Sequence, residues 1–339
     1  MPIGADLLLH EQADPEAVKH DGAALGRVLE LTARRYRTPL AFPLMDLKLE
    51  KADLLRLFDV AAANRDEYRF LEPPSETDLA RLADSLDAPF DRRHQAHIDS
   101  VRYIAASTEL LPIGMSIGPF SLMTKLLADP ITPIAMAGMG LTAAEDAQIL
   151  LAERSLALAE MAVARSVAAQ VRAGARGMLI CEPAANRVYL SPRQIEAGSD
   201  IFERFVLLPH LRLKELLDAH GVDLIFHDCG ELTDFMVRRI TESLAPAILS
   251  LGSSRRLWED AALVPKTTVL FGNLPTRSFY SDAVMPLDKV QAITAELLEN
   301  MRAVAHPHIL GSECDVLHVP DAAETIHRKV AAVLTSPER

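Results

Sequence analysis

Short apolar runs alternate with longer amphipathic segments along most of this chain. The apolar runs predict strands at 40–45, 110–117, 178–181, 222–227, 247–251, 267–272 and 308–310. Continuous apolar strands of this kind are typical of parallel sheets whose two faces are both covered. Periodicity and capping signals predict helices at 15–36, 119–125, 142–173, 199–219, 231–243, 255–263, 287–304 and 325–334.

The repetition of strand and helix predicts an α/β fold, most economically a single (β/α)8 barrel of the TIM type over residues 38–335. Residues 1–37 are predicted as an N-terminal helical extension. Residues 46–108 are polar and mixed, which predicts an excursion of short helices and loops after the first strand. A doubly wound open sheet is the alternative. No Gly-x-Gly-x-x-Gly follows the first strand and no Walker-type loop is present, so nucleotide binding has no support.

Composition and charge limit the kinds of binding partner and the cellular setting that we expect for this protein. The 339 residues carry a formal net charge of −12, which disfavours nucleic acid and anionic membranes. Three cysteines do not make a disulfide framework, and they fit a reducing, cytoplasmic setting. The first residues lack the pattern of a secretion signal. Charged residues interrupt the most apolar region, 131–171, which excludes a membrane span there.

Polar residues recur where the predicted strands end, and in a barrel these ends open on one face, where catalytic groups collect. The residues concerned are Asp46, Gly118, Glu182, His227, Cys229, Asn273 and Cys314. We expect Asp46, Gly118 and Asn273 to shape a substrate pocket and Glu182 to act in catalysis. A loop salt bridge for Glu182 and a turn cap for Asn273 are the plainer alternatives. His94 and His97 lie in a polar stretch and are predicted to be surface residues.

His227 and Cys229 are two residues apart, so on an extended segment their side chains point to the same side. Cys314 follows another predicted strand and can approach from the same rim. One imidazole and two thiolates with an open fourth position are typical of a catalytic zinc site. A thiol that enters this position loses its proton and stays electron-rich at sulfur, which suits attack on a methyl group. The alternative is that the cysteines are core residues, as we expect for Cys181.

Ordered landmarks make the chain similar to a known family. They are Ile117-Gly118-Pro119-Phe120, Cys181-Glu182-Pro183 with Ser191-Pro192, His227-Asp228-Cys229-Gly230, Phe271-Gly272-Asn273-Leu274, and the segment from His308 to Pro320 with Cys314. With these the chain resembles the uroporphyrinogen decarboxylase superfamily, and within it the zinc-dependent, cobalamin-linked methyltransferases of the methylcobalamin:coenzyme M type. The resemblance implies a TIM-type barrel and implies His227, Cys229 and Cys314 as zinc ligands. From its place at a strand end, we expect Glu182 to occupy or border the fourth position.

The function expected from this resemblance is methyl transfer between a corrinoid and a thiol that zinc activates. No corrinoid-binding module is visible, so methylcobalamin is expected on a partner protein. A metal-free decarboxylase acting on a small acid is one alternative, and a non-catalytic barrel that binds a corrinoid or another ligand is the second. Tetrapyrrole decarboxylation is disfavoured because Phe42 to Lys48 contains no arginine. The methyl donor and acceptor, and a homodimer, stay open.

Overall fold

The sheet at the centre of the molecule is parallel throughout, and its strands follow one another in chain order. A computed structural model describes residues 4–335. Its strands are β1 (Leu40–Ala41), β2 (Leu111–Ile117), β3 (Gly177–Cys181), β4 (Asp223–Asp228), β5 (Ile248–Leu251), β6 (Val269–Leu274) and β7 (His308–Ser312). The α/β class and the parallel sheet predicted from the apolar runs are therefore confirmed.

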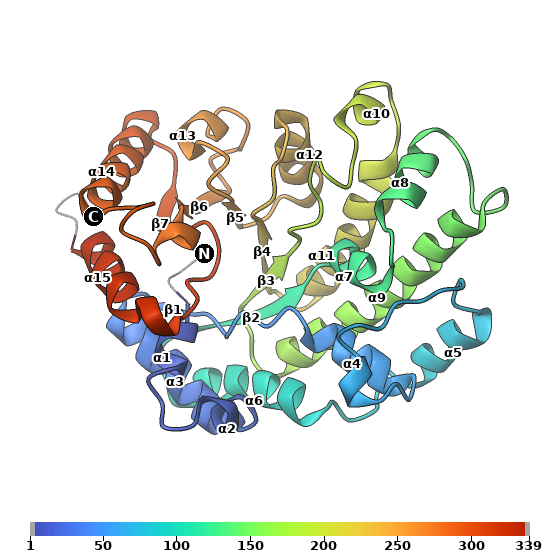
Figure 1. Cartoon of the computed structure of the whole chain (residues 1–339), viewed down its shortest axis with the longest axis horizontal. Coiled ribbons are helices and arrows are strands. Elements are labelled where there is room, and N and C mark those ends of the chain that lie inside the picture. The colour runs from blue at the N-terminus through green and yellow to red at the C-terminus, as the bar shows by residue number, and fades with distance from the viewer. Residues whose placement is uncertain (1–3, 336–339) are drawn as a thin grey trace.

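Helices surround the sheet on its outer side (Figure 1). Before β2 they are α1 (Asp6–Leu9), α2 (Pro15–Lys19), α3 (Gly22–Arg35), α4 (Leu49–Leu57), α5 (Glu76–Asp84) and α6 (Arg92–Ser107). Between β2 and β4 they are α7 (Pro119–Leu126), α8 (Ile131–Gly138), α9 (Ala147–Arg172), α10 (Pro192–Glu196) and α11 (Leu208–Ala219). After β4 they are α12 (Asp234–Leu244), α13 (Leu257–Asp260), α14 (Leu287–Val304) and α15 (Ala323–Leu334).

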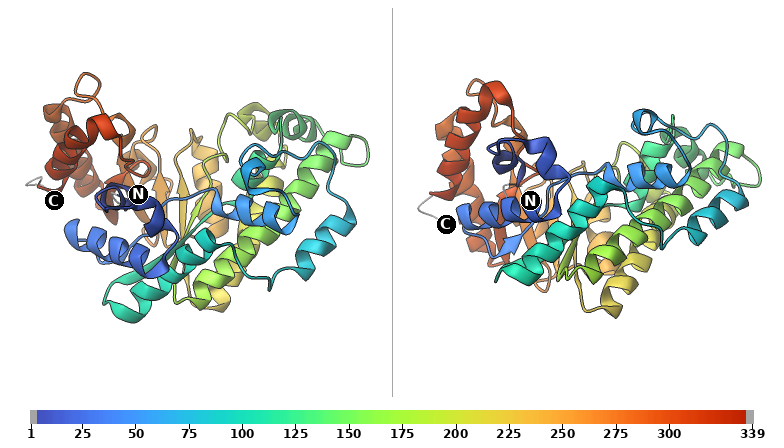
Figure 2. Two further views of the ribbon diagram at one scale, coloured as in Figure 1. Left: turned by 60° about the horizontal axis from the view of Figure 1, so that its bottom comes forward. Right: turned by 90° about the horizontal axis from the view of Figure 1, so that it is seen from below.

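The sheet curls, and the views in Figures 1 and 2 show its strands enclosed by the helices. Within residues 4–335 the sheet has seven strands, and no pairing joins β7 back to β1. Instead, residues 36–40 and 309–312 line a cavity of about 180 Å3 between these two edges. The closed eight-stranded barrel is therefore not confirmed. The reason is that the sequence contains seven apolar runs long enough to form strands and lacks an eighth.

A small set of side chains fills the inside of the curled sheet. These residues are Phe42, Ile113, Met115, Leu179, Cys181, Ile225 and Phe271. Neighbours such as Ile180 and Phe226 belong to the larger core that the helices cover. Because side chains alternate along a strand, His227 shares the inner side with Ile225, and it also lies opposite Cys181 in the parallel ladder. Cys181 is fully buried, as predicted.

The helices predicted at 15–36 and 142–173 differ in extent from those observed, and the one predicted at 255–263 is shortened to α13. The segment 15–36 is divided into α2 and α3, because the Asp21 side chain accepts a hydrogen bond from Ala24 N at 2.9 Å and starts a new helix. The long helix α9 begins after Asp146, whose carboxylate accepts from the backbone N–H groups of the next turn. Thr142 and Glu145 do bond to each other, but in the preceding turn.

The prediction that His94 and His97 lie on the surface is wrong. Both are on α6, with exposed fractions of 1% and 3%. His94 Nε2 lies 2.9 Å from Ser166 Oγ on α9. The two histidines share a helical stripe with Val101 and Ile104, so the face that packs inward carries them with it.

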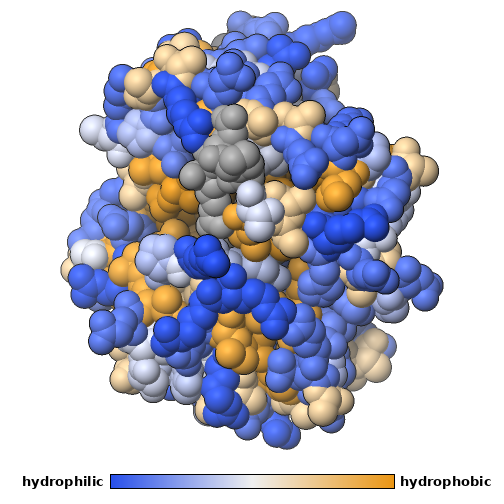
Figure 3. Space-filling view, turned by 90° about the vertical axis from the view of Figure 1, so that its left-hand side faces the viewer, coloured by the Kyte–Doolittle hydropathy of each residue, from blue (hydrophilic) through white to orange (hydrophobic). Residues whose placement is uncertain are grey.

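The outer surface is mixed in polarity. Figure 3 shows the face on the left of Figure 1, where hydrophobic patches are interrupted by hydrophilic residues. Among residues 4–335 no helix combines the length and the apolar character needed to cross a bilayer.

Candidate metal centre

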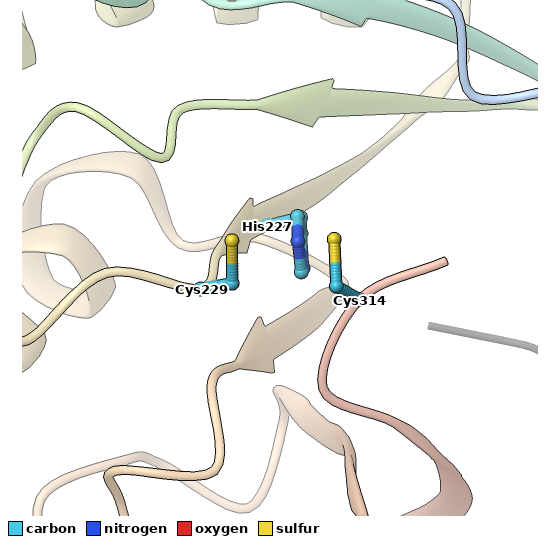
Figure 4. A group of neighbouring side chains, drawn as sticks. All are labelled: His227, Cys229 and Cys314. Carbon is cyan, nitrogen blue, oxygen red and sulfur yellow. The ribbon is translucent and has the colours of Figure 1, made fainter. Parts of the chain in front are cut away.

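His227, Cys229 and Cys314 come together at the carboxyl ends of the strands. The ligand atoms of the three residues all lie within 4.8 Å of one another. Figure 4 shows the side chains next to each other, with His227 on β4, Cys229 just after it, and Cys314 in the loop after β7. In the described part of the chain, this is the one cluster of three or more potential metal-binding side chains. The structure thus brings the predicted trio together.

The imidazole of His227 is oriented by the neighbouring strand. Its Nδ1 lies 2.9 Å from Ser250 Oγ on β5, the residue opposite it in the parallel ladder. Its Nε2 is buried and has no hydrogen-bond partner in the described residues. Burial lowers the pKa of His227, so the ring is neutral and a lone pair remains available for a metal.

The two thiols influence each other strongly. The hydrogen bond from Cys229, followed by the effects of His227 and Arg277, lowers the pKa of Cys314. The same shared proton, together with burial, raises the pKa of Cys229. Arg277 Nη2 also donates a hydrogen bond to Cys229 Sγ at 3.0 Å. Two sulfurs this close, one of them readily ionised, form a ready site for a thiophilic cation.

The donor set fits zinc. Zinc binds thiolate sulfur and imidazole nitrogen, and three protein ligands leave a fourth position for a substrate. The unpartnered Nε2 of His227 is the observation that favours a metal, because a buried polar atom normally has a partner. The Ser250 hydroxyl at the other ring nitrogen is the outer partner that metal-binding histidines usually have.

A cavity of about 480 Å3 opens beside the centre, and Cys314 forms part of its wall. Asp46 lies on the same wall, where it pairs with Arg93 at 2.6 Å and accepts from Lys48 N. The cavity also has apolar lining and two further cations, Lys125 and Arg277. Its volume is within the range of small-molecule sites. Asp46 therefore lines the cavity, and its role in substrate binding stays a prediction.

Glu182 is in a different place from the metal ligands. Its carboxylate accepts hydrogen bonds from Phe120 N at 3.1 Å and Ser121 N at 2.5 Å, at the start of α7. His210 Nε2 on α11 lies 3.3 Å away. Glu182 thus points toward the helices, opposite to its neighbour Cys181. Burial raises the pKa of Glu182 to about 7.

Gly118 makes room for the carboxylate of Glu182. A Cβ at Gly118 would lie 2.1 Å from Glu182 Oε2, so the carboxylate occupies the space that a side chain would need. Asn273 is also engaged elsewhere, since its side-chain amide donates to the carbonyls of Gly252 and Arg255 at 2.9 and 2.8 Å. The carboxylate of Glu182 and the amide of Asn273 thus bond to groups other than the three ligand side chains.

Three contributors to the centre were not expected from the sequence: Ser250, Arg277 and Glu313. Ser250 is a polar residue within an apolar strand, which is a signal that could have been noticed. Glu313 precedes Cys314 and joins two loops, because one oxygen accepts from Ser253 Oγ and the other from Arg277 N. Arg277 follows the end of β6 in an irregular turn, where the sequence pattern gives no direction for its side chain.

Comparisons with known proteins agree with this architecture. The family model of uroporphyrinogen decarboxylase (URO-D) matches residues 59–334. Among solved structures, a methyltransferase from Methanosarcina mazei is similar, with a TM-score of 0.64 and 15% sequence identity. The superposition covers 98% of this chain and 90% of that one, and at this identity it shows a common fold. No curated protein matches the sequence significantly.

Proposed function

The chain belongs to the uroporphyrinogen decarboxylase family, and from this premise we propose that it is a zinc-dependent methyltransferase of that family. It would move a methyl group between a corrinoid, carried as methylcobalamin on a partner protein, and a small thiol. His227, Cys229 and Cys314 would hold the zinc. The observation that carries the proposal is the meeting of their ligand atoms within 4.8 Å beside a cavity.

Zinc in this site would lower the pKa of an incoming thiol and hold the thiolate for reaction. The protein's own groups prepare the place. Ser250 fixes the ring of His227, burial keeps that ring neutral, and Arg277 contacts Cys229. The cavity beside Cys314 supplies room for the thiol. Because the ligands come from rigid strand ends, little ordering is required when the substrate binds.

The corrinoid is proposed to arrive on another protein. The cavity at the centre, about 480 Å3, has the size of a small-molecule site. Leu317 and Tyr280 at this cavity are 60% and 51% exposed, so the site is accessible from outside. The solved neighbour named as a methyltransferase shares the fold, which is compatible with this activity.

Metal analysis tests the zinc site directly. Protein purified under reducing, metal-replete conditions should contain about one zinc per chain. Cys229→Ser and Cys314→Ser should lose it. Cys181→Ala is the matched control, because Cys181 is buried among apolar side chains inside the sheet and should be dispensable for the metal. Zinc-free protein in which both Cys229 and Cys314 react freely with thiol reagents would instead favour a metal-free decarboxylase.

Methyl transfer is tested with methylcobalamin and a panel of thiols. The thiolate sulfur forms a bond to the methyl carbon while the cobalt–carbon bond breaks, and its electron pair stays on cobalt. The spectral change of the corrinoid and the mass of the thioether report the two halves of this reaction. If zinc is present but no thiol in the panel is methylated, the ligand-binding alternative is favoured.

A further inference from the structure

The side chain of Arg277 lies directly beside the proposed metal ligands. Arg277 is in the turn η3 (Thr276–Ser278), which follows β6. Its Nη2 donates to Cys229 Sγ at 3.0 Å, and the residue lines the same cavity as Cys314. A guanidinium has five N–H donors, and here one of them is directed at a sulfur.

The turn that carries Arg277 is held by buried contacts. Glu313 Oε1 accepts from the backbone N of Arg277 at 3.3 Å. Next in the chain, Phe279 is 1% exposed, and its carbonyl accepts from Lys329 Nζ at 2.9 Å. Lys329 is fully buried and also donates to the carbonyl of Ser281. These contacts fix the backbone of the turn beside the centre, and from it the exposed side chain of Arg277 extends to the sulfur.

The proposed reaction poses a selectivity problem at this centre. With a thiol bound, three sulfurs would surround one zinc, and an incoming methyl group should go to the substrate sulfur alone. A charge-assisted hydrogen bond withdraws electron density from the sulfur that accepts it, which makes that sulfur a weaker nucleophile. The N–H···S hydrogen bond at 3.0 Å is on Cys229, and the same guanidinium also acts on Cys314, so both sulfurs concerned belong to the protein.

We infer that Arg277 is a positioning residue that keeps Cys229 from being alkylated and so directs methylation to the bound substrate. This inference rests on the proposed function, since it concerns the metal-loaded centre. It assigns the arginine to the protein's own sulfur, through the contact at 3.0 Å, and not to recognition of the substrate. Removing the donor should leave the zinc in place and expose a competing nucleophile.

Alkylation of zinc-loaded protein with iodoacetamide measures this property without any methyl donor. The cysteine sulfur forms a bond to the CH2 carbon as the carbon–iodine bond breaks and iodide leaves. Peptide mass spectrometry locates the modified cysteine. Arg277→Met keeps the bulk and removes the donor, and Cys229 should then react about tenfold faster. Arg277→Lys, which keeps a charged donor, should restore part of the protection.

Arg256→Met is the matched control, because Arg256 is an exposed arginine that pairs with Glu259. In Arg256→Met, the rate at which iodoacetamide alkylates Cys229 should equal the rate in the wild-type protein. Cobalt(II)-loaded protein gives an independent readout, since the sulfur-to-cobalt absorption band should shift in Arg277→Met and remain unchanged in Arg256→Met. The zinc content of every variant is measured alongside.

Equal alkylation of Cys229 in the unmodified protein and in Arg277→Met would overturn the inference. So would loss of zinc from Arg277→Met, because the arginine would then be retaining the metal itself. Altered alkylation without methyl transfer to any thiol would reject the proposed function and leave the role of Arg277 standing. Methyl transfer to a thiol, with unchanged alkylation of Cys229 in Arg277→Met, would support the proposed function and reject the role of Arg277.

Discussion

His227 Nδ1 lies 2.9 Å from Ser250 Oγ, and the two residues are opposite each other on adjacent parallel strands. One ring nitrogen is thereby committed to the protein, and the other, Nε2, is left buried without a hydrogen-bond partner in the described residues. The sheet register itself thus selects the nitrogen that can bind a metal.

Ser250→Ala removes this hydroxyl, so the ring of His227 is no longer oriented. We expect zinc affinity to fall by roughly 10- to 100-fold, the usual effect of losing an outer partner of a metal ligand. Competition with a chromogenic chelator measures the change. Ser155→Ala is the control, because Ser155 is a buried serine on α9 whose hydroxyl has no hydrogen-bond partner among residues 4–335. Equal affinities in the two variants would contradict the role assigned to Ser250.

Glu182→Gln should keep the zinc and change the pH dependence of stability. The folded pKa of Glu182, about 7, is above the ordinary glutamate value of 4.5, because burial disfavours the charged form. The folded state therefore holds this proton more tightly, and its contribution to stability is lost as pH rises from about 4.5 through about 7. Glutamine does not titrate, so the variant keeps its stability as pH rises. Across this pH range its free energy of unfolding should increase relative to that of the wild type by on the order of 3 kcal/mol.

Urea titrations at several pH values measure this difference for Glu182→Gln. Glu50 and Asp315, two other buried acids, are not influenced by Glu182, so their titration cancels in the comparison. Glu196→Gln, at an exposed helix end, should leave the profile unchanged. Loss of zinc from Glu182→Gln would return Glu182 to the metal centre, where the sequence had suggested it.

Gly118→Ala should destabilise the fold through its contact with Glu182. The added methyl group would lie 2.1 Å from Oε2 and 2.5 Å from Cδ of that carboxylate, so one of the two must move. Overpacking of this kind costs about 1–3 kcal/mol. In a Glu182→Ala background the space is free, and the same substitution should cost little. A double-mutant cycle from urea unfolding measures the coupling, and additive effects would show that the clash is relieved elsewhere.

Asn273→Asp should destabilise more than Asn273→Ala. The amide NH2 donates to two backbone carbonyls, Gly252 and Arg255. Alanine loses these bonds and leaves the two acceptors unpaired, which should lower the free energy of unfolding by about 1–3 kcal/mol. Aspartate adds a carboxylate that faces carbonyl oxygens, so the repulsion increases the loss. Thermal unfolding ranks the variants. A reduced affinity for a thiol with unchanged stability would instead favour the predicted role in substrate binding.

The cluster of His227, Cys229 and Cys314 could be predicted because it depends only on local residue spacing and on the topology of the sheet. His227 and Cys229 share a side through their spacing, and all strands of a parallel sheet end at one edge, which brings in Cys314. Glu182 has the same position at a strand end but points to the other face. In a sheet covered on both faces, apolar runs do not distinguish the inner side from the side that packs against helices.

The remaining contributors depend on tertiary contacts that no local pattern records. Arg277 reaches Cys229 from a turn that Glu313 and Lys329 hold in place, and these residues come from the loop after β7 and from α15. The strand count differs for another reason, since an eighth strand was expected from the usual number in such barrels and not from an apolar run in the chain. His94 and His97 were misplaced because their polarity was weighed above the helical stripe that they share with Val101.

The ligands lie at opposite ends of a continuous run of four strands, with His227 on β4 and Cys314 just beyond β7. They meet only when β4, β5, β6 and β7 are all in register. Under the proposed function, metal uptake would therefore report on the folding of the whole C-terminal half. A lesion in β5 or β6 that touches none of the three ligands should first be detected as a loss of bound metal.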